Sequence, residues 1–552
     1  MASITKQCAV SGKGFVITDE DQAFYKKVEV PEPTLCPEER RRRRLAIRNE
    51  TSLYSGTCAK TGKSMISMYS PDSPYTIYDR DEWWKNDWDP LEYGQEFDFS
   101  RPFFEQFEEL QLKVPRMALV GLHNENSTFI SYSAHNKDSY LIYTADYNEK
   151  CYYMRFSDRN YSCLDADFTY DSRFCLNVFH AINCETCFYS YKIKGSSGLY
   201  FCYNMQSCHD CMFSANLQNQ QYVIFNKKVS KEEYEKMKAN MGLDTQAGMG
   251  KAKKYFEEHI QKFPRKNLEN MRCEDSTGDY LEGCKDTHES FNCEGLRDVK
   301  FATHLHQTTD AYDWDFIGYK CQLCYEMCSS CYNLRNCRFC MNIWEGADNL
   351  TYTDLCIDNK DLFGCVGLRK KEYCILNKQY TKEQYEELVP KIIEHMKSTG
   401  EWGEFFPVSI SPYGYNETVA QEYFPLTKEE ALTRGYKWKD KDDSAAYQGP
   451  EVTLPEAVAD ADESVCDKVL QCAESSDFYK IIPQELKFYK RFGIALPRIA
   501  PMERHGERMK LRNPRKLWDR TCGKCAASIK SSYAPERPEP VYCEDCYLKE
   551  VF

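Results

Sequence analysis

Residues 151–211 decide the fold. They read CYYMRFSDRNYSCLDADFTYDSRFCLNVFHAINCETCFYSYKIKGSSGLYFCYNMQSCHDC. Cysteines recur in this stretch at a few fixed spacings, such as Cys184 to Cys187, Cys175 to Cys184 and Cys163 to Cys175, and Tyr, Phe, Asn, Ser and Asp fill the intervals. Short strands that turn at Asn, Asp or Gly and present a small side chain inward are typical of a β-solenoid. Cysteine is small and apolar enough to stack in ladders inside such a coil. The stretch therefore predicts a cysteine-rich β-solenoid.

A second stretch has the same texture, and the two belong to a tandem duplication. The motif Ile224-Phe225-Asn226-Lys227 recurs downstream as Ile375-Leu376-Asn377-Lys378. Each motif is followed by a capping box that opens a helix, formed by Ser230 with Glu233 and by Thr381 with Gln384. Such helices would cover the open ends of a solenoid, where unpaired strand edges invite aggregation. We therefore expect two solenoid units with capping helices, in a fold that is mainly β with helices.

The second stretch also allows a metal-binding interpretation. Three successive Cys-x-x-Cys pairs would suit a second metal site, holding zinc or an iron–sulfur cluster. The first stretch has only two such pairs. Its repeating pattern of cysteines separated by Tyr, Phe, Asn, Ser and Asp continues where the cysteines are single. Buried ladder cysteines are therefore the favoured interpretation, and metal binding stays open as the alternative. The six cysteines concerned are Cys321, Cys324, Cys328, Cys331, Cys337 and Cys340.

The two ends of the chain carry another duplication, which keeps a constant offset without a gap. Cys8 and Cys58 recur as Cys472 and Cys522, and prolines, aromatic residues and arginines recur in the same register. The C-terminal copy holds two Cys-x-x-Cys knuckles, and their four thiolates can converge on one Zn²⁺. A closed four-thiolate site serves folding rather than catalysis. We predict one structural zinc site, made by Cys522, Cys525, Cys543 and Cys546.

The equivalent positions of the N-terminal copy are Cys58, Thr61, Asp79 and Glu82. One thiolate with hard oxygens is a poor zinc site, so this copy is interpreted as having lost its metal. Trp83, Trp84 and Trp88 could supply a replacement core. Two further ribbons have decayed in the same way, one with Cys8, Ser11, Cys36 and Glu39, the other with Cys472, Ser475, Ala500 and Glu503.

Both end modules contain a basic run. Basic residues beside a zinc ribbon suit phosphate contacts on nucleic acid. The alternative is a solvated helix face paired with nearby glutamates such as Glu38 and Glu503. The candidate nucleic-acid contacts are Arg40, Arg44, Arg48, Arg504, Arg508 and Arg512.

Catalytic motifs are weak by comparison. The chain has no nucleotide-binding glycine loop, nucleophile elbow or zincin motif. One dense group of possible metal ligands consists of His304, His306, Asp310, Asp313 and Asp315. Polar residues on the outer face of a solenoid strand would give the same pattern. His209 lies between Cys208 and Cys211 in sequence and could activate a thiol. Enzymatic activity therefore has no positive support from the sequence.

Composition limits the class of protein. The 552 residues are 42% hydrophobic and 14% aromatic, enough to bury a core, and the formal net charge of −13 disfavours a protein wrapped in nucleic acid. No apolar run approaches the ~18 residues of a membrane helix, and no export signal is visible. The expected location is the reducing cytoplasm, where the 29 cysteines would be metal ligands or packing residues.

These observations predict five segments and a function. The chain is expected to be a non-catalytic, zinc-binding scaffold with an unknown protein partner, with nucleic-acid binding as the alternative and no membrane association. The expected segments are a degenerate zinc-ribbon module (1–100), two β-solenoid units with helices (101–250 and 251–399), a connector (400–465) and a zinc-ribbon module (466–552).

Several phrases resemble an uncharacterised cysteine-rich family of candidate-phylum bacteria with zinc-ribbon-like ends. They include CAVSGKGFVI, VPEPTLCPEERRRRRLAIRNE, YGQEFDFSRPFFEQF and LRNPRKLWDRTCGKC. The resemblance covers essentially the whole chain. Other members have complete knuckles where this chain has Ser11, Glu39, Thr61 and Glu503. Some relatives carry the label of CaiB/BaiF-type CoA-transferases, which would imply a CoA-transferase. This chain has no identifiable catalytic aspartate or glycine-rich active-site loop for that activity.

Overall fold

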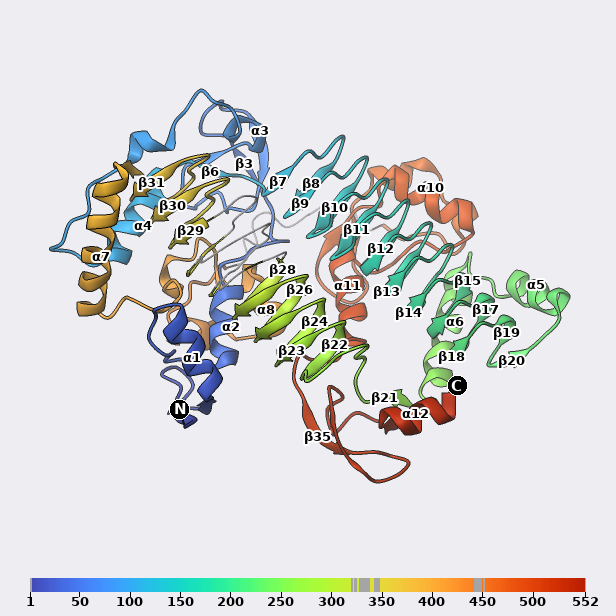
Figure 1. Ribbon diagram of the computed structural model, residues 1–552. Coiled ribbons are helices and arrows are strands. Elements are labelled where there is room, and N and C mark those ends of the chain that lie inside the picture. Colours follow the sequence, from blue (N-terminus) through green and yellow to red (C-terminus); the bar gives the residue numbers. More distant parts are fainter. Residues whose placement is uncertain are drawn as a thin grey trace. The chain divides into compact units, whose positions relative to one another are not determined.

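The computed structural model describes residues 2–318, 321, 325–326, 338–341, 348–440, 449 and 452–551. The fold is mixed sheet and helix (Figure 1). The chain divides into two compact units, and each is discontinuous in sequence. Unit 1 combines Met1–Leu119 with Glu269–Asp440, and unit 2 combines Val120–Leu268 with Lys441–Phe552. Each unit therefore contains one end of the chain and one β-solenoid.

The solenoid of unit 2 is built from coils of constant length. Tyr140 is paired in parallel with Tyr152, and Leu164 with Leu176, so successive coils stack in constant register. Figure 1 shows these strands side by side. Their bounds are β7 (Gly121–Leu122), β8 (Thr128–Ser131), β9 (Ser133–Ala134), β10 (Tyr140–Tyr143), β11 (Tyr152–Arg155), β12 (Leu164–Tyr170), β13 (Leu176–Ile182), β14 (Tyr191–Lys194), β15 (Ser197–Tyr200), β16 (Tyr203–Gln206), β17 (His209–Met212), β18 (Ala215–Gln218) and β19 (Gln221–Ile224).

The coil turns through a left-handed residue at every third position. Phe129, Tyr132, His135 and Asp138 have φ values of 55°, 52°, 56° and 49°. A left-handed backbone costs roughly 1–2 kcal/mol for a residue with a Cβ. It persists here because the coils above and below fix each peptide by hydrogen bonds. Each coil thus has four sides, each ending at one left-handed residue.

Cysteine, serine, asparagine and aliphatic side chains fill the interior of this solenoid, one from each side of a coil. Ser172, Cys184, Ser196 and Cys208 form one such ladder, with the N–H of Cys184 donating to Ser172 Oγ at 3.1 Å and that of Cys208 to Ser196 Oγ at 3.1 Å. The Cys202 thiol lies next to the carbonyl oxygens of Tyr200 and Cys211, at 3.5 and 3.4 Å. The prediction of a cysteine-rich β-solenoid is confirmed.

Most described coils of the unit 1 solenoid have the same length, but the pairing of Met271 with Glu282 makes one coil a residue shorter, and that of Tyr312 with Tyr325 makes one a residue longer. Asp348, Lys360 and Glu372 lie opposite one another in neighbouring parallel strands. Its described strands are β22 (Gly278–Glu282), β23 (Lys285–His288), β24 (Ser290–Glu294), β25 (Arg297–Lys300), β26 (Thr303–His306), β27 (Thr309–Tyr312), β28 (Asp315–Gly318), β29 (Asp348–Thr351), β30 (Lys360–Phe363) and β31 (Glu372–Ile375).

Asparagine side chains close the last coils. The Asn226 amide exchanges two hydrogen bonds with the backbone of Ala215, and Asn377 does the same with Val366. The short strands β20 (Lys227–Lys228) and β32 (Lys378–Gln379) then pair antiparallel with β19 and β31. The helices α5 (Lys231–Asn240) and α7 (Lys382–Ser398) follow, and both open with the predicted capping boxes.

Two helices each pack in a different unit from the solenoid that follows them in sequence. Helix α4 (Phe103–Lys113) precedes the solenoid of unit 2, but its Phe103 ring lies 5.4 Å from Phe363 in unit 1. Helix α6 (Gln246–Ile260) precedes the solenoid of unit 1, but Phe256 lies 6.0 Å from Phe201 in unit 2. The contiguous segments expected from the sequence are therefore distributed differently between the two units.

The end modules are built from short hairpins and helices. In unit 1 these are β1 (Ile4–Gln7), β2 (Gly14–Ile17), α1 (Asp19–Lys27), α2 (Pro37–Leu45), β3 (Tyr54–Thr57), β4 (Ser64–Ser67), β5 (Ile77–Tyr78), α3 (Arg80–Trp83) and β6 (Arg116–Met117), with α8 (Val419–Tyr423) and α9 (Lys428–Thr433) further along the chain. In unit 2 they are β33 (Leu470–Gln471), β34 (Phe478–Tyr479), α10 (Pro483–Phe492), α11 (Pro501–Lys510), β35 (Trp518–Thr521), β36 (Ser528–Ser531), β37 (Val541–Tyr542) and α12 (Glu544–Val551). Among the described helices, none has the length and apolarity needed to cross a membrane.

Candidate metal centre and the arginine networks beside the solenoids

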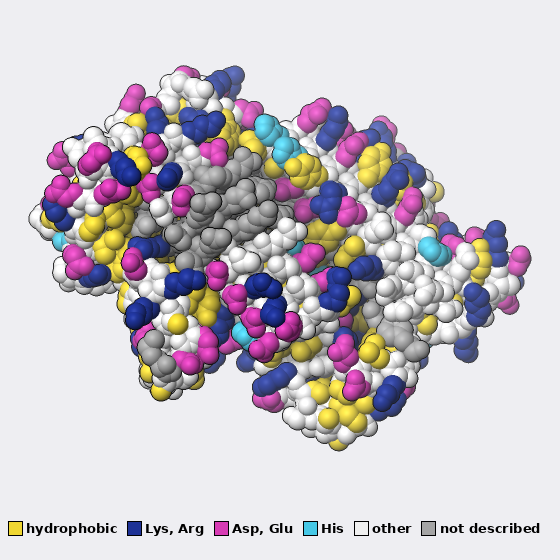
Figure 2. Space-filling view, viewed as in Figure 1, with side chains coloured by type: hydrophobic (Ala, Val, Ile, Leu, Met, Phe, Trp, Pro, Cys, Tyr) yellow, Lys and Arg dark blue, Asp and Glu magenta, His cyan; other side chains and the backbone are white. Residues whose placement is uncertain are grey.

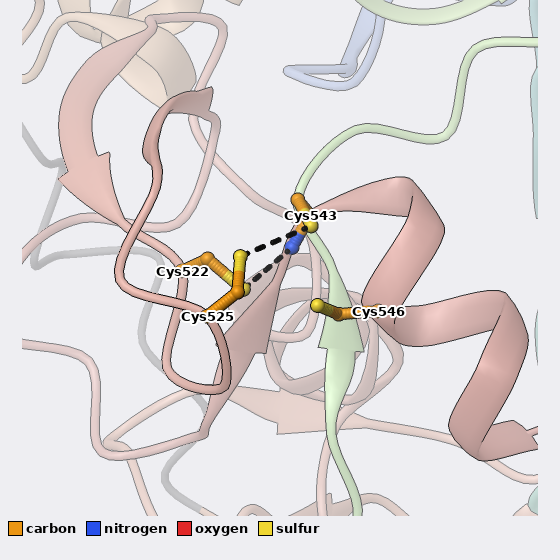
Figure 3. Close-up of side chains that lie close together, drawn as sticks. All are labelled: Cys522, Cys525, Cys543 and Cys546. Carbon is orange, nitrogen blue, oxygen red and sulfur yellow. Dashed lines mark hydrogen bonds between the residues drawn. The ribbon is translucent and has the colours of Figure 1, made fainter.

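Four cysteines converge at the C-terminal end of unit 2 (Figure 3). Cys522 and Cys525 lie on the turn between β35 and β36, Cys543 follows β37, and Cys546 lies in the first turn of α12. Their sulfur atoms all lie within 4.8 Å of one another. Among the residues that the structure describes, this is the one group of His, Cys, Asp and Glu side chains close enough to hold a metal ion.

The spacing of the sulfurs fits tetrahedral coordination. A Zn–S bond of about 2.3 Å places the sulfurs of a tetrahedral site about 3.8 Å apart. The Cys525 and Cys543 sulfurs are 3.8 Å apart. A site of four thiolates suits Zn²⁺ or another thiophilic ion and leaves no coordination position for a substrate.

The local electrostatics favour the thiolate form at Cys522 and disfavour it at Cys546. Burial acts to raise the pKa of the Cys522 thiol, but N–H groups of Cys525, Cys543 and Lys524 outweigh it and lower that pKa to about 6. The hydrogen bond with the neighbouring Cys543 sulfur raises the pKa of Cys546 to about 12. A bound divalent cation would stabilise all four thiolates together.

The solenoid cysteines have a different environment. Burial raises the pKa of Cys211 to about 12 and that of Cys284 to about 11. The thiols lie within hydrogen-bonding distance of backbone carbonyls instead of converging; Cys340 is 2.9 Å from the carbonyls of Arg338 and Leu350. The raised pKa values of Cys211 and Cys284 disfavour the thiolate form that a metal ligand requires.

The predicted second metal site is only partly within the described residues. Cys321 and Cys340 are fully buried. Cys324, Cys328, Cys331 and Cys337 lie outside the described residues. The second site therefore stays a prediction.

The predicted nucleic-acid contacts of unit 2 form buried ion pairs with the solenoid. Arg504 on α11 pairs with Asp165 at 2.9 Å, and Arg508 with Asp167 at 2.5 Å. His505 lies 3.0 Å from Asp167. These two arginine and two aspartate side chains are at most 5% exposed.

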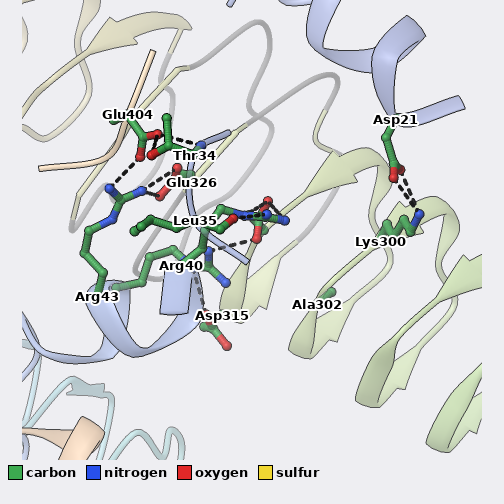
Figure 4. Close-up of polar contacts among 12 residues, drawn as sticks. Asp21, Thr34, Leu35, Arg40, Arg43, Lys300, Ala302, Asp315, Glu326 and Glu404 are labelled. Carbon is green, nitrogen blue, oxygen red and sulfur yellow. Dashed lines mark hydrogen bonds and ion pairs between the residues drawn. The ribbon is translucent and has the colours of Figure 1, made fainter. Parts of the chain in front are cut away.

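The same arrangement occurs in unit 1. Arg40 on α2 pairs with Asp313 at 2.9 Å, and Arg44 bridges Asp313 and Asp315, both at 3.0 Å. Figure 4 shows part of this network. Beside it, the Arg43 guanidinium binds Glu326 at 2.8 Å and Glu404 at 2.7 Å. In both units an arginine-bearing helix thus docks on an Asp-x-Asp pair of the solenoid.

The remaining two arginines also contact the protein. Arg48 pairs with Glu50 at 2.6 Å and lies 4.4 Å from the centre of the Phe316 ring. Arg512 is half-buried and lies over Phe168 at 5.8 Å. The nucleic-acid role stays a prediction, and five of the six arginines could reach a phosphate only if their ion pairs opened. On the face shown in Figure 2, basic and acidic side chains are interspersed.

The ligand-like histidines do not converge with the aspartates. His304 is buried and stacks on Phe316 with ring centres 6.0 Å apart, whereas His306 lies 3.5 Å from Glu294. Asp313 and Asp315 are the partners of arginines. His209 is exposed and hydrogen-bonded to Ser197 at 2.8 Å, while Cys208 and Cys211 are buried inside the coil.

Sequence reasoning missed the carboxylates that pair with the basic runs. It considered only glutamates nearby in sequence, but Asp165 and Asp167 belong to the other half of the chain from their partners Arg504 and Arg508. A signal was present: Asp313 and Asp315 recur as Asp165 and Asp167, just as their arginines recur. No protein-family model matches the chain, and no curated protein sequence matches it significantly.

Proposed function

We propose that the chain is a non-catalytic scaffold protein with one structural Zn²⁺ at Cys522, Cys525, Cys543 and Cys546. The convergence of four sulfurs without an open coordination position carries this proposal. The two solenoids and their docked modules fit a description as tandem units flanked by zinc-ribbon-type modules. Stacked coils provide extended surfaces of the kind that repeat proteins use to bind protein partners.

A reducing, cytoplasmic location and membership of the cysteine-rich family named above are part of the proposal. Buried, protonated solenoid thiols are compatible with such a compartment. The alternatives are nucleic-acid binding, and a metal-dependent enzyme or CoA-transferase. Nucleic-acid binding predicts an affinity that falls steeply with salt, whereas a protein partner held by an apolar interface would be retained.

The proposal is tested by elemental analysis of protein purified anaerobically without added zinc. We expect about one zinc per chain, lost in a Cys522→Ser/Cys546→Ser variant. The matched control is Cys184→Ser, because this cysteine stacks between Ser172 and Ser196 in one ladder. The control should retain the metal. Three or more metals, or any iron, would instead assign metal to the run from Cys321 to Cys340 and overturn the proposal.

A further inference from the structure

The four-cysteine site lies beside the segment through which the chain leaves unit 2. Strand β37 ends at Tyr542, directly before the ligand Cys543. It pairs in parallel with β21 (Arg265–Lys266), and the chain passes into unit 1 after Leu268. The metal site and this crossover segment, residues 265–268, are therefore adjacent in the structure.

The C-terminal module holds the crossover segment from two sides. The N–H of Arg265 donates to the Pro540 carbonyl at 2.8 Å, and that of Asn267 to Tyr542 at 3.0 Å. From β36, the carbonyl of Lys530 accepts from the Asn267 amide at 3.0 Å, and the Ser531 hydroxyl donates to the Asn267 carbonyl at 3.0 Å. Both β36 and β37 must keep their places for these bonds to coexist.

The four cysteines connect those two strands. Cys522 and Cys525 lie on the turn of the hairpin that contains β36, and Cys543 and Cys546 follow β37. The N–H of Gly523 donates to the Val541 carbonyl at 2.9 Å, and the N–H of Cys543 donates to Cys522 Sγ at 3.2 Å. Residues of β35 are mostly exposed or half-exposed, so apolar packing contributes little there. A small module of this kind depends on its metal for folding.

Unit 1 contains an equivalent crossover, where Cys58, Thr61, Asp79 and Glu82 stand at the positions of the four cysteines. The N–H of Arg116 donates to Thr76 at 2.8 Å, and that of Ala118 to Tyr78 at 2.9 Å, in the same register. Here the fully buried Trp83 packs against Met117 and donates from Nε1 to the Pro115 carbonyl at 2.9 Å. This segment is held by backbone hydrogen bonds and by the packing of Trp83.

We propose that metal binding by the four cysteines clamps residues 265–268, while the equivalent segment 116–118 is clamped independently of metal. The inference rests on the proposed metal site. It gives that site a specific task, which is to fix one of the segments that join the two units. Metal loss would free this segment and leave both solenoids folded.

Hydrogen exchange of the full chain, with and without a zinc chelator, tests the clamp. We expect the amides of Arg265 and Asn267 to exchange at least tenfold faster after metal removal. The amides of Arg116 and Ala118 should keep their rates, as should Ala166 inside the solenoid. These amides are internal controls within one molecule.

Two results would overturn the clamp, and they can be told apart. If elemental analysis shows that metal is bound and then removed while the 265–268 amides keep their rates, the clamp alone is wrong. If the purified protein binds no metal, the proposed metal site fails as well. An Asn267→Ala/Ser531→Ala variant, which changes no ligand and keeps both backbone bonds to Pro540 and Tyr542, should keep its zinc and the slow exchange of these amides. Fast exchange with the zinc still bound would contradict the clamp.

Discussion

The hairpin modules at 54–83 and 518–547 have one backbone framework and two different means of stabilisation. In the first, Ala59 N–H donates to Ile77 at 2.9 Å and Asp79 N–H to Cys58 Sγ at 3.3 Å. In the second, the equivalent bonds from Gly523 and Cys543 measure 2.9 and 3.2 Å. The framework is thus compatible with four thiols and with one.

The side chains differ where the metal would be. In the N-terminal module, Lys60 contacts Glu82 and Asp87, and Trp83 is fully buried beside Trp84 and Trp88. The position of Trp83 is taken by Tyr547 in the other module, where its hydroxyl lies 2.6 Å from the Asn204 amide nitrogen on the solenoid. The same framework therefore accommodates packed indole rings in one module and a group of four thiols in the other.

The largest expected effect comes from restoring the missing ligands. A Thr61→Cys/Asp79→Cys/Glu82→Cys variant would complete a second four-cysteine set around Cys58. Because the backbone frameworks match, we expect metal content to rise from about one to about two per chain, with an apparent binding free energy of roughly 10 kcal/mol or more. Elemental analysis and competition with a chelator measure both quantities.

The control for this variant is Thr61→Ser/Asp79→Ser/Glu82→Ser, which makes the same three exchanges without thiols. It should bind no additional metal. A folded cysteine variant with unchanged metal content would show that the tryptophan packing has altered the framework beyond metal binding.

The sequence predicted the local architecture better than the long-range packing. The recurring cysteine spacings reflect one inward side chain from each side of a coil of constant length, so the solenoid was predictable. The knuckle spacing of Cys522, Cys525, Cys543 and Cys546 likewise predicted their convergence. Both signals are local, and they depend on repeats that hydrogen bonds between neighbouring residues or coils impose.

The distribution of segments between the units was not predictable in this way. Helix α4 and the arginines of α2 pack against solenoid residues from a distant part of the chain. No periodicity specifies which solenoid a helix will cover when both offer similar faces. The arginine run from Arg40 to Arg44 resembled a nucleic-acid contact because Asp313 and Asp315, the carboxylate partners of Arg40 and Arg44, lie far away in the sequence.

The paired arginine networks offer the second comparison between units. Asp313→Asn would leave Arg40 and Arg44 buried with less compensating charge, and Asp165→Asn would do the same to Arg504 and Arg508. Breaking a buried ion pair by neutralising one partner typically costs about 3–5 kcal/mol. We expect both variants to lower the unfolding free energy by this amount, measured by urea denaturation.

A matched substitution separates charge from packing. Replacing both partners by apolar residues, as in Asp313→Leu/Arg40→Met, removes one buried arginine as well as its carboxylate and should cost less than Asp313→Asn alone. Equal losses would mean that shape, and not the uncompensated guanidinium, controls stability at this contact.

The smallest expected effect is the pH dependence that Glu485 of unit 2 contributes. Asp21 in unit 1 pairs with Lys300 at 2.8 Å. The equivalent residue in unit 2 is Glu485, which lies 3.4 Å from Arg504 and shares this arginine with Asp165. Burial raises the pKa of Glu485 to about 7, against the attraction of Arg504. Between about pH 4.5 and pH 7, the folded state therefore holds a proton that the unfolded state has released.

It follows that Glu485 makes the protein less stable as pH rises through this window, by at most about 1.4 kcal/mol per pH unit. Above pH 7 its contribution is constant. The Glu485→Gln variant should lose this dependence while keeping amide contacts to Tyr153 and Tyr489. Denaturation curves at several pH values measure the difference in unfolding free energy between the wild-type protein and this variant. The contributions of the other carboxylates are the same in both proteins and cancel in this difference. If the difference in unfolding free energy stays constant from pH 5 to pH 8, Glu485 is ionised throughout this range. Arg504 would then stabilise the charges of both Glu485 and Asp165.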